Sequence, residues 1–150
     1  MRHRSRLVAA LSLATCGLSL LGATTPGTSV TVTVTDLRNT KGVVRACMTT
    51  NAKVFPKCRD DANSHRLVVN AGSRVILTFD NVQPGTYAIA LLHDENNNGK
   101  SDRALMMMPK EGYGFSRDAK VSMGPPKFAA AAFTVGSQPV SQTIRMRYML

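Results

Sequence analysis

Residues 29–37 read SVTVTVTDL, in which valine alternates with threonine or serine. Successive side chains of a β-strand point to opposite faces, so this alternation places the valines on one face and the hydroxyl side chains on the other. The segment is typical of a strand that buries one face and exposes the other. A turn follows at residues 39–42, and residues 42–50 (GVVRACMTT) look like its partner strand, so we predict a β-hairpin here.

Shorter segments of the same character follow, with turn residues between them. We expect further strands at residues 65–70, 74–79, 86–92, 119–123, 129–135 and 140–149. The alanine run at residues 129–132 also allows one helical turn, and no other segment after the N-terminal region has a convincing helical period. We therefore predict an all-β fold, a single antiparallel β-sandwich of about seven to eight strands that is prealbumin-like or immunoglobulin-like.

The first 25 residues have the layout of a secretory signal peptide. Three arginines within the first six residues precede an apolar stretch at residues 7–21. This stretch is shorter than the ~20 residues of a membrane-spanning helix, so we expect cleavage and no transmembrane span in the mature chain. An alternative is a lipid anchor at Cys16, because residues 13–16 (LATC) resemble a lipobox. Residues 26–150 are then a single β-sandwich domain in the periplasm or outside the cell.

The charge of the chain is basic but dispersed. The 19 Lys and Arg residues stand against 9 Asp and Glu, and removal of the three signal-peptide arginines leaves 16 against 9. No two of these remaining basic residues are adjacent, whereas nucleic-acid binding concentrates them on one face. We therefore expect no nucleic-acid partner, and a scattered positive surface that favours an envelope component or another protein.

Cys47 and Cys58 are the two cysteines that follow the predicted signal peptide. In an oxidising compartment such an isolated pair is expected to form a disulfide, worth roughly 2–3 kcal/mol for a loop of this length. A redox or metal-binding pair is the alternative, but there is no CxxC spacing and no clear partner ligand nearby.

Residues 93–102 (HDENNNGKSD) form the most informative local motif. Oxygen donors fall at alternate positions, which are Asp94, Asn96, Asn98, Lys100 through its backbone carbonyl, and Asp102. This spacing, with a glycine at position 99 that permits a positive φ, matches the first nine positions of an EF-hand-type calcium loop. Ca²⁺ is therefore the cofactor that the sequence suggests.

The motif lacks the glutamate that closes such a loop. Leu105 stands at that position, and Glu95 or Glu111 could be recruited instead. With so few charges we expect weak affinity, roughly 0.1–1 mM. The alternative is a turn that binds no metal and is stabilised by hydrogen bonds from its own side chains to its backbone.

The stretch at residues 111–116 (EGYGFS) combines glycines with aromatic rings. Tyr113 and Phe115, with His93 and Glu111, are our candidate binding residues, and the alternative is that the rings fill one end of the sandwich. His93 with Asp94 or Glu111 is also the one titratable group that suggests a hydrolase, but no catalytic motif accompanies it. We assign no catalytic residue, and we expect the methionines at 106–108 to fill the core rather than bind copper.

Several of these segments, in this order, resemble one family. They are PGTYA at residues 84–88, HDENNNGKSD at 93–102, EGYGFS at 111–116 after Pro109, and GPP at 124–126 before Phe128. The family is the secreted bacterial family catalogued as domain of unknown function 2141, and the resemblance spans roughly residues 30–148. It implies a signal peptide and a prealbumin-like sandwich, but no established activity. One departure is Met107–Met108–Pro109, where members often have Gly-Ile-Pro.

These observations favour an exported, non-catalytic β-sandwich that acts as a binding or interaction module, with a calcium-stabilised loop rich in Asp and Asn. The alternative is a periplasmic hydrolase that uses His93 with Asp94 or Glu111.

Overall fold

The computed structural model describes residues 26–104 and 108–150. The predicted signal peptide at residues 1–25, and Leu105, Met106 and Met107, lie outside the described residues. Among the helices that are described, none has the length and apolar character needed to cross a membrane.

The predicted all-β class is confirmed, with eight strands and two short helical turns in the described residues. The strands are β1 (Thr28–Thr35), β2 (Val43–Thr49), β3 (His65–Asn70), β4 (Val75–Val82), β5 (Gly85–Asp94), β6 (Gly112–Phe115), β7 (Phe133–Val135) and β8 (Val140–Arg145). The helical turns are η2 (Ser116–Asp118) and α1 (Phe128–Ala131).

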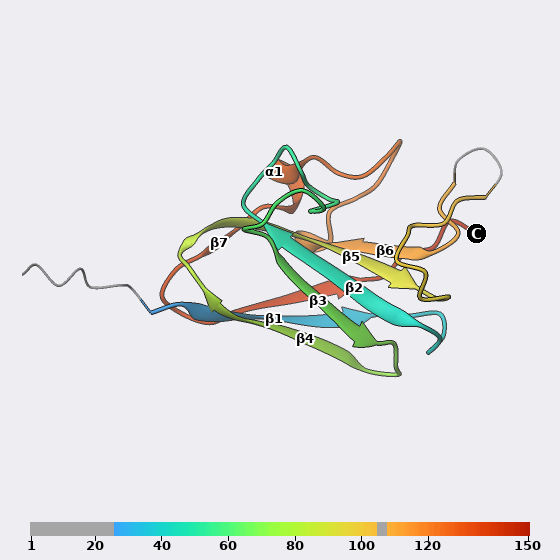
Figure 1. Ribbon diagram of the computed structural model, residues 1–150, viewed down its shortest axis with the longest axis horizontal. Coiled ribbons are helices and arrows are strands. Elements are labelled where there is room, and N and C mark those ends of the chain that lie inside the picture. Colours follow the sequence, from blue (N-terminus) through green and yellow to red (C-terminus); the bar gives the residue numbers. More distant parts are fainter. Residues whose placement is uncertain (1–25, 105–107) are drawn as a thin grey trace, which may run out of the picture.

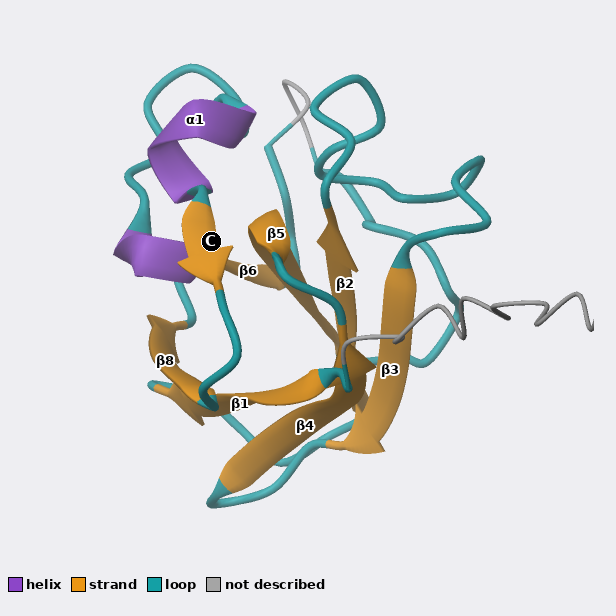
Figure 2. Cartoon of the chain, turned by 90° about the vertical axis from the view of Figure 1, so that its left-hand side faces the viewer, coloured by secondary structure: helices purple, strands orange, loops and turns teal. Residues whose placement is uncertain are grey.

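The strands form two sheets that stack as a sandwich (Figures 1 and 2). One sheet has the order β4-β1-β8, and the other has the order β3-β2-β5-β6, with β7 pairing to the start of β5. In Figure 2 the three-stranded sheet lies below the five-stranded sheet. A short backbone bridge between Tyr113 and Arg147 also links β6 to the segment after β8.

The valine alternation of β1 forms the centre of the core. Val30, Val32 and Val34 are at most 4% exposed, while the threonines between them are half-buried on the opposite face. The valines share one apolar cluster with Met48 of β2 and Ile89 of β5. The strand and its buried face are therefore where the sequence predicts them.

The predicted hairpin between residues 29–37 and 42–50 is wrong. β1 lies in the three-stranded sheet and β2 in the five-stranded sheet. Both strands have a continuous apolar face, and the two faces bury each other when the strands lie in stacked layers rather than side by side. The connecting residues 36–42 therefore cross from one sheet to the other.

One strand pair also departs from the predicted antiparallel arrangement. β8 pairs with β1 in parallel, with Val32 opposite Gln142, whereas β4 pairs with β1 antiparallel. A parallel pair needs a long crossover connection. Here the chain passes through the five-stranded sheet and α1 before it returns as β8.

Two predicted strands near the C-terminus are also revised. Residues 119–123 belong to no strand, because Ala119 alone among them is fully buried. Residues 129–135 divide into the helical turn α1 and the short strand β7. The alanine run thus takes the helical alternative, and strand geometry begins at Phe133.

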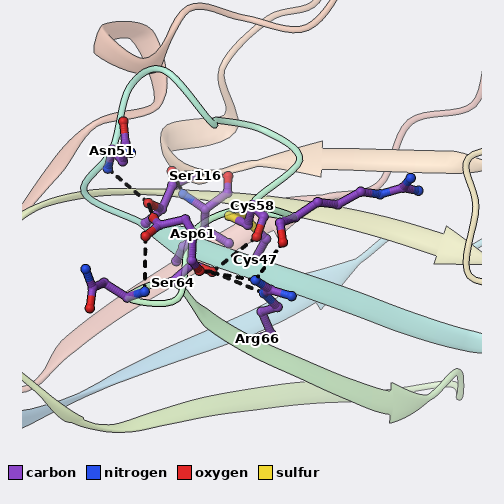
Figure 3. The surroundings of a disulfide bond; sticks show 11 residues. Cys47, Asn51, Cys58, Asp61, Ser64, Arg66 and Ser116 are labelled. Carbon is purple, nitrogen blue, oxygen red and sulfur yellow. Dashed lines mark hydrogen bonds between the residues drawn. A yellow bond between two sulfur atoms is a disulfide. The ribbon is translucent and has the colours of Figure 1, made fainter.

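The predicted disulfide between Cys47 and Cys58 is confirmed, with the two Cα atoms 6.2 Å apart. Figure 3 shows the bond where the loop after β2 folds back over the five-stranded sheet. Within this loop Phe55 packs edge-on against Phe115 and Phe128, with ring centroids 5.9 Å apart in each pair. The loop therefore helps to cover a second apolar cluster on the outer face of the sheet.

We expect Leu77→Ala to lower the free energy of unfolding by about 2–5 kcal/mol, because Leu77 is 1% exposed and its loss leaves a cavity. Ile76 is its neighbour on β4 but is 46% exposed. Ile76→Ala should therefore cost less than about 1 kcal/mol. Urea denaturation of the two variants measures both values, and equal losses would contradict the assigned faces of β4.

We expect the double variant Cys47→Ala, Cys58→Ala to lose roughly 2–3 kcal/mol of stability, because the unfolded chain gains the entropy of an open loop. Denaturation of wild type with and without a reductant is the matched control. Reduced wild type should approach the double variant, and an unchanged midpoint on reduction would contradict the prediction.

Candidate functional site

The predicted calcium loop connects β5 to β6. Asp94 ends β5 and Gly112 begins β6, and these two strands pair with His93 opposite Gly112. Both ends of the loop therefore start from the same end of the five-stranded sheet, at the right of Figure 1. Residues 96–101 of the loop are exposed.

Asp94 is fully buried and organises the first half of the loop. Its carboxylate accepts hydrogen bonds from Arg45 Nε at 2.6 Å, from the backbone N–H of Asn98 at 3.0 Å and from that of Gly99 at 2.9 Å. Burial would raise the pKa of Asp94, but these hydrogen bonds outweigh it and hold the pKa below its ordinary value. Asp94 is therefore an ionised group around which the turn is built.

The asparagines continue the same pattern. The side-chain oxygen of Asn96 accepts the N–H of Asn98 at 3.1 Å, and that of Asn98 accepts the N–H of Lys100 at 2.9 Å. Asn97 and Gly99 have φ values of 53° and 76°, which bend the chain around these side chains. The loop therefore has side-chain-to-backbone hydrogen bonds of the kind expected for an Asn-rich turn.

Three side chains of the loop converge on one point. Asp102 Oδ2 accepts a hydrogen bond from Asn96 Nδ2 at 2.7 Å and another from Asn98 Nδ2 at 2.8 Å. Both interactions lower the pKa of Asp102, that with Asn98 more strongly. The structure therefore brings together Asn96, Asn98 and Asp102, three of the predicted metal ligands, through amide-to-carboxylate hydrogen bonds.

Glu111 approaches the loop from the start of β6. The residue is 3% exposed, and its Oε2 accepts the backbone N–H of Asp102 at 3.1 Å. Its other oxygen, Oε1, is buried and has no hydrogen-bond partner among the described residues. Burial raises the pKa of Glu111, and the negative charges of Asp94 and Asp102 raise it further, against the lowering effect of the backbone N–H groups of Asp102 and Glu95.

The donors around this loop are mainly amide and carboxylate oxygens. In the described part of the chain, no three His, Cys, Asp or Glu side chains meet in a group that could hold a metal. Amide and carboxylate oxygens are the donors that calcium and magnesium prefer, whereas zinc and copper prefer nitrogen and sulfur ligands.

His93 has a structural position inside the molecule. It is fully buried, with Nε2 2.8 Å from the carbonyl oxygen of Lys41 and Nδ1 2.7 Å from the Tyr148 hydroxyl. A carbonyl only accepts, so Nε2 carries a proton and donates to Lys41, and Nδ1 is hydrogen-bonded to the Tyr148 hydroxyl. His93 and Asp94 are successive strand residues that point to opposite faces, so they do not form a catalytic pair.

Tyr113 and Phe115 lie on the second apolar cluster. Phe115 is 5% exposed and belongs to that cluster, and the half-buried Tyr113 packs against it. The glycines between and before them serve close packing on the other face of β6. A Cβ at Gly112 would overlap the ring of Tyr148, and one at Gly114 would lie 2.7 Å from Ile144 Cγ2.

Sequence reasoning missed three residues around the loop: Arg38, Arg45 and Tyr148. Arg38 donates to Glu95 from Nε at 3.0 Å, and its guanidinium lies 4.5 Å from the centre of the Tyr148 ring. Nothing near Arg38 or Tyr148 in the sequence marks these long-range contacts. Arg45 did carry a signal, because it is the one charged residue within the apolar strand β2.

The ion pair between Arg38 and Glu95 makes stability depend on pH. The hydrogen bond from Arg38 lowers the pKa of Glu95 from its ordinary 4.5 to about 2. A carboxyl whose pKa is lower in the folded state stabilises the fold above its ordinary pKa, and that contribution is lost as the pH falls from 4.5 toward about 2.

We therefore expect Glu95→Gln, in EDTA, to lower Tm at pH 7 and to flatten the fall of Tm over this acid range. Asp80→Asn removes an exposed carboxylate of β4 and is the control that should retain the wild-type profile. Thermal melts at a series of pH values measure the effect, and identical profiles for Glu95→Gln and wild type would contradict it.

Comparison with known proteins gives one match, to a family model. No curated protein and no solved structure was found to match. Residues 32–143, well over half of the chain, match the family model described as uncharacterized protein conserved in bacteria. The chain therefore belongs to this bacterial family, DUF2141.

Proposed function

We propose that this protein is an exported, non-catalytic β-sandwich module whose β5–β6 loop binds one calcium ion and contacts a partner in the cell envelope. The observation that carries the proposal is the convergence of Asn96 and Asn98 on Asp102, with N–O distances of 2.7 and 2.8 Å. Three of the side chains that would coordinate the ion are therefore already in contact.

Calcium binding needs a small rearrangement of this loop. The amide groups of Asn96 and Asn98 would release Asp102 and turn their oxygens toward the ion. An amide oxygen has two lone pairs, so the same oxygen can accept a hydrogen bond from a backbone N–H and coordinate a cation at the same time. Asp94, Asp102 and the carbonyl of Lys100 complete the donors that the loop itself offers.

The affinity should be weak, because part of the negative charge is already neutralised. Arg45 forms a 2.6 Å ion pair with the buried carboxylate of Asp94. The binding free energy that calcium gains from Asp94 is then smaller than it would gain from a carboxylate without an ion-pair partner. A dissociation constant of roughly 0.1–1 mM, the range of extracellular modules, is consistent with a protein that works outside the cytoplasm.

Export is supported by two independent features. The first residues follow the pattern of a secretory signal, and the Cys47–Cys58 disulfide is typical of an oxidising compartment. The exposed loop residues 96–101 offer a polar surface for a partner. A hydrolase centred on His93 gains no support, because both ring nitrogens bind protein groups inside the fold.

We expect calorimetric titration of the protein expressed without residues 1–25 to give a calcium Kd of roughly 0.1–1 mM. Calcium at roughly 10–100 times Kd should then stabilise the fold by about 1.4–2.7 kcal/mol. Asp102→Asn should lose most of this gain, because a ligand charge is removed.

Asp36→Asn removes a carboxylate whose side chain is 60% exposed and is paired with Arg145, so it is the matched control and should bind calcium as wild type does. Magnesium should give little heat, because it demands octahedral geometry and keeps its water. Wild type that shows neither heat nor a melting shift with calcium would end the proposal.

A further inference from the structure

Glu111 reaches the calcium loop through a fold of the chain that its sequence position does not reveal. After Asp102 the chain turns back on itself, with a bridge between Arg103 and Pro109. The Lys110 N–H then donates to the Asp102 carbonyl at 3.0 Å, and the Asp102 N–H donates to Glu111 Oε2 at 3.1 Å. Glu111 is therefore beside the last residue of the loop.

The carboxylate of Glu111 has an unused oxygen at this point. The residue is 3% exposed, and its Oε1 has no partner among the residues that the structure describes. A buried polar atom without a partner is costly, and one explanation for such an atom is a bound ion. Asn96, Asp102 and Glu111 also line the same surface hollow, together with Arg38, Glu95, Lys110 and Leu150.

Glu95, the other carboxylate near the loop, is already engaged. It accepts hydrogen bonds from Arg38, one of them at 3.0 Å, and from the side chain of Asn39. Its charge is neutralised by the guanidinium, and recruiting it would break the ion pair. Among the described residues Glu111 forms no ion pair, and it lies near the negative charges of Asp94 and Asp102.

From this geometry we infer that Glu111 is the carboxylate ligand that closes the calcium site. The inference rests on the proposed function. Glu111 takes the place of the glutamate that an EF-hand loop supplies three residues after its ninth position, and here the ligand is the residue just before β6. Calcium would then join the end of β5 to the start of β6, so occupancy of the site would tie the two strands together.

The chain contains two glutamates, Glu95 and Glu111, which allows a direct test on unaltered protein. Protein labelled with ¹³C at the glutamate side-chain carboxyl should give two carboxyl NMR signals. The spectrum of Glu95→Gln assigns the two signals, because the signal of Glu95 is missing from it. On addition of calcium alone, the Glu111 signal should shift with saturation, and the Glu95 signal should change much less.

Variants give the second readout. Glu111→Gln should weaken calcium binding roughly tenfold or more, since even residues that only support metal ligands cost 10–100-fold. Its Tm in EDTA should equal or exceed that of wild type, because a buried, unpaired charge is removed. Glu95→Gln is the matched control and should retain calcium affinity within about threefold.

The outcomes separate the two claims. If wild type binds calcium and the shifting signal is that of Glu95, or if Glu111→Gln binds as tightly as wild type, this inference is overturned and the calcium loop stands. If wild type binds no calcium, the proposed function and this inference fail together.

Discussion

Strand β5 is buried on both faces, and the rest of the molecule is arranged around it. Tyr87, Ile89 and Leu91 point into the main core between the sheets. Ala88 and Ala90 point the other way, into the cluster covered by the disulfide loop and α1. The small alanines leave room for the aromatic rings that cover them, so the outer layer can pack closely on the sheet.

The same alternation points the last two residues of β5, His93 and Asp94, to opposite faces of the sheet. His93 continues the inward-facing series and joins Lys41 and Tyr148, so it connects the first inter-sheet loop to the C-terminal segment. Asp94 continues the outward-facing series and meets Arg45 and the exposed loop. One residue therefore secures the fold, and the next one organises the site.

The sequence predicts the features that depend on neighbouring residues. The β1 alternation, the disulfide and the convergence of Asn96, Asn98 and Asp102 all follow from short spacings. The sheet order did not follow, because pairing between β1 and β8 is set by how whole faces pack. The sequence names both Glu95 and Glu111 as possible recruits to the loop but does not choose between them. Their contacts, including that of Arg38, depend on folded-back or distant segments, on which a local pattern contains no information.

The position of β1 between β4 and β8 has a consequence for the order of assembly. The first strand of the sheet needs the last one as a neighbour, so a chain that emerges N-terminus first from a ribosome cannot complete this layer until nearly its whole length is available. Such distant partners slow folding. Until then the edge of β1 that pairs with β8 has no strand partner and stays open to pairing with another chain.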